Sequence, residues 1–200
     1  MRDRLSVIMR HQATLMGKFR HIEEQNGFNF HGDVELGVPQ NINAYGTQHE
    51  LRRLAWCIQE ELCEAASAMD SGTASDSKLE IQKELIDALH FICEFLLTLG
   101  YWPSDLPAED FRRPEYVPEG LTPNLFQTMV LLGMTINELK NKPWKQTPRV
   151  TDLDKFKDQL ARFMRSFIRT CYASGMTDQD IEDVYLGKNS ENQERIATGV

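Results

Sequence analysis

Apolar residues recur at helical spacing along most of the chain. Between residues 3 and 24 they return every three or four positions, which predicts an amphipathic helix with one amide, Gln12, set into its apolar stripe. The same spacing predicts five more helices, over residues 48–69, 78–99, 125–140 and 153–173 and from about residue 177. No stretch shows the alternating pattern of a strand, so we expect an all-α fold.

Two stretches rich in turn-forming residues interrupt this pattern. Gly, Asn and Pro residues mark a long loop over residues 26–46, and a second, proline-rich stretch covers residues 103–123. Proline lacks the amide hydrogen that a helix interior needs, so the second stretch cannot lie within a helix. We interpret it as a connector between two halves, about 1–102 and 124–200, of a single domain that spans residues 1–200.

The two halves resemble each other. KELIDALHFICEFLLTLGYWPSDL in the first half aligns with KDQLARFMRSFIRTCYASGMTDQDI in the second, apolar residue over apolar residue, with Gly100 over Gly175. This similarity indicates a duplicated helical hairpin, with chance similarity between amphipathic helices as the alternative. Duplication would leave the second copy as scaffold, because its residues replace the polar ones of the first: Gln159 for Glu84, Arg162 for Asp87 and Arg165 for His90.

The charge of the chain argues against a nucleic-acid polymer as partner. Its 30 acidic residues outnumber its 22 basic ones, which gives a net charge of -8, and no segment gathers basic residues. An excess of carboxylates instead suits divalent cations, which can bring a phosphorylated small molecule to an acidic protein.

The four cysteines and the apolar segments predict a soluble cytoplasmic protein. The cysteine spacing matches neither a zinc site nor a redox pair, so we expect reduced thiols. The longest apolar stretch, residues 89–99, contains His90 and Glu94 and falls far short of the ~20 residues of a membrane span.

Acidic residues lie in pairs on two consecutive predicted helices. Glu61 and Glu64 project from one face of the first helix, and Glu84 and Asp87 from one face of the second. The short connection makes these helices antiparallel neighbours, so the four carboxylates can converge within an apolar surround. Ionised carboxylates repel one another there unless cations lie between them, and oxygen ligands favour Mg²⁺ or Mn²⁺.

Two other interpretations of these acids are open. Acidic residues three apart are common on solvated helix faces, and they would then have no function. Alternatively, His90 follows Asp87 by three residues, and di-iron carboxylate proteins use Glu-x-x-His ligands. Those proteins need two such motifs, and no histidine follows Glu64, so we expect His90 to be a packing residue or a partner of ligands.

The segments EELCE and ELID resemble the signature Glu-Glu-x-x-Glu and Glu-x-x-Asp of the all-α NTP pyrophosphatases, the superfamily of MazG-like proteins and dimeric dUTPases. IMRHQATL, NGFNF, ELIDALHF and YLGKNSENQERIATG are similar to segments of the dimeric dUTPases and of related phage dCTP/dUTP pyrophosphatases, in the same order. The resemblance therefore covers nearly the whole chain, and the KN-x-x-N-x-x-R ending is specific to this branch.

The resemblance implies a fold, an activity and a set of site residues. The activity is Mg²⁺-dependent hydrolysis of a deoxynucleoside triphosphate to the monophosphate and pyrophosphate, by attack of a metal-bound water on the α-phosphorus. Glu61, Glu64, Glu84 and Asp87 would hold the metal, and Glu61 would take the proton. Gln12 would read the pyrimidine edge. Four residues near the end would bind the phosphates and part of the nucleoside: Lys188, Asn189, Asn192 and Arg195.

The chain also departs from the dUTPase pattern. TLMGKF lacks the asparagine that usually follows the first glutamine, and SAMDSGTASD stands in place of a tryptophan-lysine segment. dUTP is the first choice of substrate because the resemblance is closest to the dimeric dUTPases, and these departures leave dCTP or a modified pyrimidine triphosphate as alternatives. A di-metal carboxylate oxidase and a non-enzymatic helical interaction protein are the alternatives of other classes. The many apolar helix faces favour a homodimer.

Overall fold

The computed structural model describes residues 1–27, 34–69, 74–107, 120–142 and 144–199. Within this part the regular structure is entirely helical, which confirms the predicted all-α fold. The elements are α1 (Arg2–Gln25), α2 (Tyr45–Ala68), α3 (Ala74–Leu99), a 3-10 turn η1 (Pro103–Asp105), α4 (Leu121–Asn137), α5 (Leu153–Ala173) and α6 (Asp178–Thr198). Residues 28–30 of the NGFNF segment and residues 108–119 of the connector lie outside the described part.

Helix α4 begins and ends several residues earlier than its sequence pattern predicts. α4 begins at Leu121 although Pro123 follows, because proline in the first turn gives up only an amide that has no partner there. The helix ends at Asn137, before Glu138, whose buried carboxylate binds Lys140 and Lys155 (3.3 and 2.9 Å). The proline-rich connector is therefore shorter at its end than predicted.

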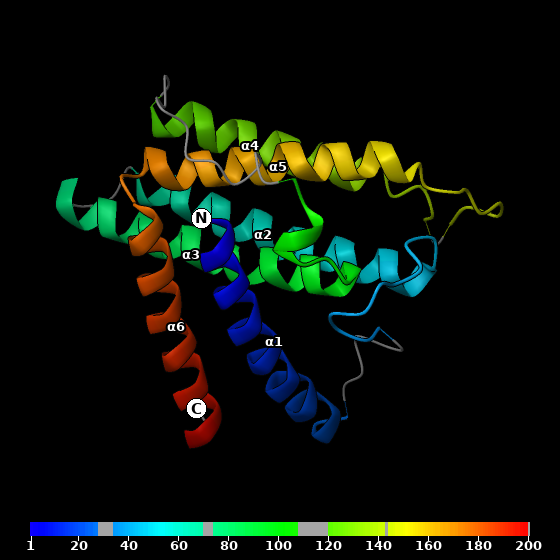
Figure 1. The fold of residues 1–200 in the computed structure, drawn as a ribbon, viewed down its shortest axis with the longest axis horizontal. Coiled ribbons are helices and arrows are strands. Elements are labelled where there is room, and N and C mark those ends of the chain that lie inside the picture. The colour runs from blue at the N-terminus through cyan, green and yellow to red at the C-terminus, as the bar shows by residue number, and fades with distance from the viewer. Residues whose placement is uncertain (28–33, 70–73, 108–119, 143, 200) are drawn as a thin grey trace.

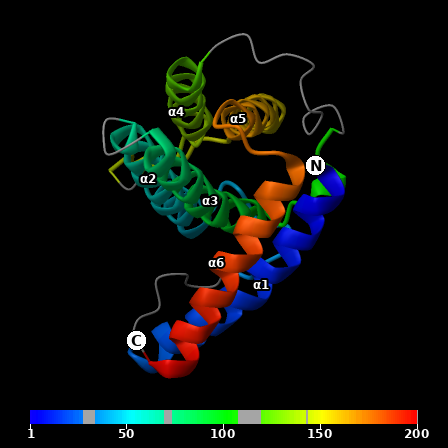
Figure 2. The same ribbon diagram turned by 90° about the vertical axis from the view of Figure 1, so that its left-hand side faces the viewer.

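Helices α2 to α5 form a bundle, and α1 and α6 cross it. α2 packs against α3 and α4 against α5, and the two hairpins lie over each other along the long axis of the molecule (Figure 1). α1 and α6 lie side by side, contact α3 and extend away from the bundle (Figure 2). Side chains from all six helices join one apolar core. No helix in the described ranges is long and apolar enough to cross a membrane.

The two hairpins end in the same turn. Gly100 and Gly175, which the sequence alignment pairs, both have positive φ (71° and 88°). After α3 the Gly100 amide binds the carbonyl of Leu97 and the Tyr101 amide that of Leu96, and after α5 the matching residues make the matching bonds. This glycine-terminated motif at aligned positions supports the proposed duplication.

Contacts between the ends of α1 and α6 fix their pairing. The amino group of Met1 lies 2.8 Å from the carboxylate of Asp178, and Arg4 forms an ion pair with Glu182. Thr177 and Asp180 close the first turn of α6 in a reciprocal capping box. The two crossing helices are thereby held over the α2–α3 hairpin, where they enclose a cavity.

Candidate active site

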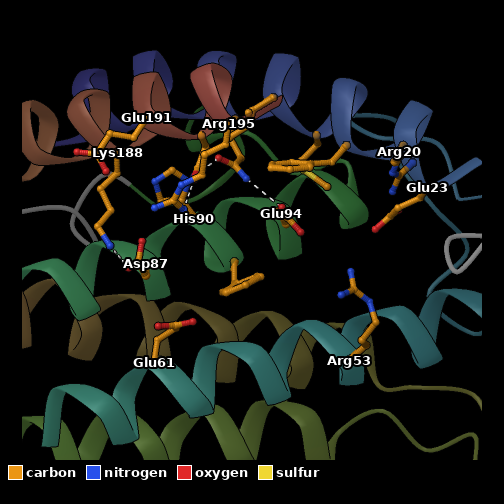
Figure 3. Close-up of a pocket in the computed structure, with 16 residues that line it drawn as sticks. Arg20, Glu23, Arg53, Glu61, Asp87, His90, Glu94, Lys188, Glu191 and Arg195 are labelled. Carbon is orange, nitrogen blue, oxygen red and sulfur yellow. Dashed lines mark hydrogen bonds and ion pairs between the residues drawn. The ribbon is translucent and has the colours of Figure 1, made fainter. Parts of the chain in front are cut away.

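A cavity of about 410 Å³ lies between α1, α6 and the α2–α3 hairpin. Its labelled side chains come from all four helices (Figure 3). Glu61, Asp87 and Lys188 lie at one end, and Arg20, Glu23 and Arg53 at the other, with His90 and Glu94 between them along α3. The cavity is therefore long and polar at both ends.

Three of the four predicted carboxylates converge at the first end. Glu61, Glu84 and Asp87 each offer an oxygen atom, and these atoms lie within 4.8 Å of one another. All three side chains are half-buried between apolar residues of α2 and α3, such as Leu62 and Leu85. Glu64 is exposed and lies outside this group, although it is one helical turn from Glu61. The structure thus brings together three acids instead of four.

The cluster shifts the pKa of two of its members. Burial, followed by repulsion from Asp87, Glu64 and Glu84, raises the pKa of Glu61 to about 7. Burial and the neighbouring Asp87 also raise the pKa of Glu84. Such shifts mean that ionised carboxylates are destabilised at this site, and a bound cation would stabilise them.

Helix α6 supplies positive charge to the same end of the cavity. Lys188 forms an ion pair with Asp87, and Arg195 and Asn192 also line the cavity. Asn189 lies elsewhere: it is buried, its Oδ1 atom accepts a hydrogen bond from Gln193 Nε2 (2.9 Å), and it is not part of the cavity wall. Three of the four predicted α6 residues therefore line the cavity.

Gln12 lies in the cavity wall and is held by three side chains. Its Oε1 atom accepts hydrogen bonds from the Tyr185 hydroxyl (2.5 Å) and from His90 Nδ1 (3.0 Å), and its Nε2 atom donates to Glu94 (3.0 Å). The imidazole of His90 stacks on the Tyr185 ring, with centroids 4.2 Å apart. Protein groups thus satisfy an amide that is only 2% exposed.

The second end of the cavity contains more charge than the sequence pattern predicts. Arg53 binds the buried Glu50 through two hydrogen bonds (2.8 and 2.9 Å). Arg20 donates to the carbonyl of Val34, and burial lowers its pKa against the opposing effect of Glu50 and Glu94.

The sequence predicted no substrate-binding role for several residues that line the cavity, although it marked His90 as a packing residue or a partner of ligands. His90 and Glu94 follow Asp87 at intervals of three and four, so they lie on the face of α3 that also carries the acidic pair. This helical spacing could have predicted that both residues line the site. The sequence gives no comparable indication for Arg20 and Arg53, because single arginines on amphipathic helices are common.

The family model described as dUTPase matches residues 38–199, which is most of the chain. The matched segment includes the three converging acids and the α6 residues of the cavity, and it excludes α1. Neither a curated protein sequence nor a solved structure matches the chain significantly.

Proposed function

This chain belongs to the dUTPase family and is a nucleotide pyrophosphohydrolase of the dUTPase type, and we propose that it converts dUTP to dUMP and pyrophosphate with Mg²⁺. dCTP or a modified pyrimidine triphosphate is the alternative substrate. The observation that carries this proposal is the cavity itself, in which carboxylates of α2 and α3 face Lys188 and Arg195 of α6. We also propose that the protein acts in the cytoplasm, where free cysteines such as those of this chain are usual.

The donor set fits a hard divalent ion. Glu61, Glu84 and Asp87 offer only oxygen atoms, and their mutual repulsion is the reason that a cation is favoured there. Glu64, one turn from Glu61, would complete the set. When bound, Mg²⁺ or Mn²⁺ would lower the pKa of a water molecule and neutralise charge on the phosphate oxygens.

The chain's own residues account for the remaining parts of the reaction. The Glu61 carboxylate accepts the proton of the attacking water. Lys188 Nζ and the Arg195 guanidinium hold the phosphate oxygens, and Asn192 adds an amide donor. Asn189 supports this segment of α6 from behind, next to Tyr185. Gln12 selects the base.

The oxidase and the non-enzymatic interpretations fit the site less well. His90 is bound to Gln12 and is not among the three converging ligand groups, whereas a di-iron site needs histidine ligands. A protein that had kept only the fold would not need three converging, half-buried acids, since their repulsion lowers the stability of the native state.

The proposal is tested by hydrolysis of dUTP, dCTP, dTTP, dATP and dGTP with Mg²⁺ in water enriched in ¹⁸O. We expect pyrophosphate release that is fastest with a pyrimidine nucleotide, with the label in the monophosphate, because the attack is on the α-phosphorus. Label in orthophosphate, or no turnover of any of the five, would refute the proposal.

We also propose that the chain forms a homodimer through α4. This helix has no charged residue, although 26% of the chain is charged, and Phe126, Val130 and Met134 are exposed along it (66, 44 and 41%). An uncharged apolar face lets two copies that each carry a charge of -8 approach without repulsion. Light scattering should show a dimer that Phe126→Asp dissociates and that Val150→Asp, at another exposed site, leaves intact.

A further inference from the structure

The orientation of the Gln12 amide is fixed from both sides. A carbonyl oxygen has two lone pairs, and in Gln12 both accept hydrogen bonds, from Tyr185 and from His90 Nδ1. On the other side, Glu94 offers Gln12 only a carboxylate oxygen as acceptor, so it selects the amide nitrogen. If the amide were reversed, its oxygen would face that carboxylate and its nitrogen would face the Tyr185 hydroxyl.

The same bonds fix the state of His90. Because Gln12 Oε1 can only accept, the hydrogen of the neutral imidazole must lie on Nδ1, which leaves a lone pair on Nε2. Burial, with Lys188 nearby, lowers the pKa of His90 to about 3, so the ring stays neutral near pH 7. His90 Nε2 is buried and has no hydrogen-bond partner among the described residues.

Tyr185 makes this arrangement possible without lining the cavity. Its side chain is fully buried, its ring stacks on His90, and its hydroxyl lies on the far side of the Gln12 amide, next to Asn189. Burial raises the pKa of the hydroxyl well above its ordinary value, so it remains a donor. Tyr185 can therefore act on a bound base only through Gln12 and His90.

We propose that Tyr185 is a positioning residue for base selection. Its hydroxyl fills the second lone pair of Gln12 Oε1, so Gln12 and His90 offer the nucleotide only one arrangement of hydrogen-bond donor and acceptor. The base then meets a fixed N–H donor of Gln12 beside a fixed acceptor, His90 Nε2. Loss of the hydroxyl removes one of the two bonds that hold Gln12 Oε1, so the amide can turn and offer its oxygen to a second kind of base edge. This inference rests on the proposed function, because it assumes a nucleotide in this cavity.

The test compares Tyr185→Phe with Tyr172→Phe. Tyr172 is a matched control because it is also buried and its hydroxyl donates a hydrogen bond to Asp178 (2.6 Å), the first residue of α6. For Tyr185→Phe we expect the ratio of kcat/KM between the best and second-best nucleotide to narrow about tenfold, mainly through KM. The kcat of the best substrate should stay within about threefold of the parent, with Mg²⁺ dependence unchanged.

Three results would overturn the proposal: an unchanged ratio in Tyr185→Phe, an equal change in Tyr172→Phe, or a loss confined to kcat. In the Gln12→Ala background, Tyr185→Phe should have no further effect on the ratio, and an independent effect would also count against the proposal.

A readout without substrate separates this inference from the proposed function. The ring nitrogen signals of His90 in the ¹⁵N NMR spectrum of the wild-type protein near pH 7 should show hydrogen on Nδ1 and none on Nε2. Hydrogen on Nε2 would refute the network, whether or not the protein hydrolyses a nucleotide and whether or not Tyr185→Phe folds. If the network is present and no nucleotide is hydrolysed, the proposed function fails and base selection by Tyr185 fails with it.

Discussion

The α2–α3 and α4–α5 hairpins share a backbone plan and differ in what their polar residues face. Asp87 and His90 of α3 point into the cavity, whereas Arg162 and Arg165, at the aligned positions of α5, are exposed. Gln159, aligned with Glu84, is buried. Because α1 and α6 cross only one of these helix faces, the same helical positions become a cavity wall in one hairpin and a solvated surface in the other.

The interior of the second hairpin shows how polar residues are buried without a site. The hydroxyl of Thr128 lies 2.8 Å from that of Ser166 and 2.9 Å from that of Thr170, and Thr128 and Thr170 also donate to helix carbonyls. Neutral groups can satisfy one another in this way, whereas three carboxylates cannot. The difference teaches that the chemistry of this molecule depends on the helices that cover a hairpin, since α6 brings the opposing charge.

The largest expected effect is the loss of turnover when the acidic residues of the first hairpin are replaced. We expect Glu61→Gln, Glu64→Gln, Glu84→Gln and Asp87→Asn each to lower turnover at least ~100-fold, because each removes a proposed metal ligand. The proteins should still fold, because an uncharged amide removes both the burial of a charge and the repulsion that together raise the pKa of Glu61. Turnover with saturating Mg²⁺ and thermal unfolding measure the two results.

The reverse substitution in the second hairpin is the control for these variants. Gln159→Glu with Arg162→Asp restores the acids of the first hairpin to the second, and it should create no new metal site. Comparable metal affinity by calorimetry after removal of all four first-half acids would show that the second hairpin is more than scaffold.

The glycines that end the two hairpins should differ in their tolerance of alanine. At Gly100 a Cβ atom would lie 2.3 Å from the backbone of Val38 and Pro39, whereas at Gly175 it would meet only the flexible end of Lys78 at 3.0 Å. Each substitution should lower the free energy of unfolding by about 1 to 2 kcal/mol, because alanine is strained at positive φ. Gly100→Ala should lower the free energy of unfolding by at least about 1 kcal/mol more, as overpacking does, and equal values in urea titrations would contradict this packing.

Substitution of Gln12 tests what α1, which covers only the first hairpin, contributes to base selection. Gln12→Ala removes the amide that His90, Glu94 and Tyr185 hold in the cavity wall. We expect it to raise KM for the preferred nucleotide and to narrow its advantage over other nucleotides by roughly 10- to 100-fold, with metal affinity unchanged. An unchanged ranking of nucleotides would mean that Gln12 is a core amide and that base selection lies elsewhere.

Helical periodicity explains which parts of this site could be predicted. Glu84 and Asp87 share a face of α3 whatever the tertiary structure, so their convergence with Glu61 follows from a short hairpin. The exposure of Glu64 does not follow, because spacing gives a face only to within about a third of a turn. The contact between Gln12 and Tyr185 depends on how α1 and α6 cross α3, and no local pattern encodes that crossing.

The smallest difference concerns pH, because His90 is buried and its counterpart Arg165 is exposed. Burial, with Lys188 nearby, lowers the pKa of His90 to about 3, so the unfolded chain binds a proton below about pH 6.5 that the native state excludes. His90 therefore makes the free energy of unfolding fall as the pH decreases from about 6.5 toward 3, by at most about 1.4 kcal/mol per pH unit. Glu61 has a raised pKa, so it makes the free energy of unfolding rise as the pH decreases from about 7 to 4.5. The pH dependence of the wild-type protein alone therefore does not isolate the effect of His90.

The difference between wild type and His90→Gln in urea titrations at pH 6.5, 5.5 and 4.5 isolates the contribution of His90, and the variant should lose less stability on acidification. Arg165→Gln should follow the wild-type slope, and a slope like that of His90→Gln would show that the two aligned positions are not distinguished by burial.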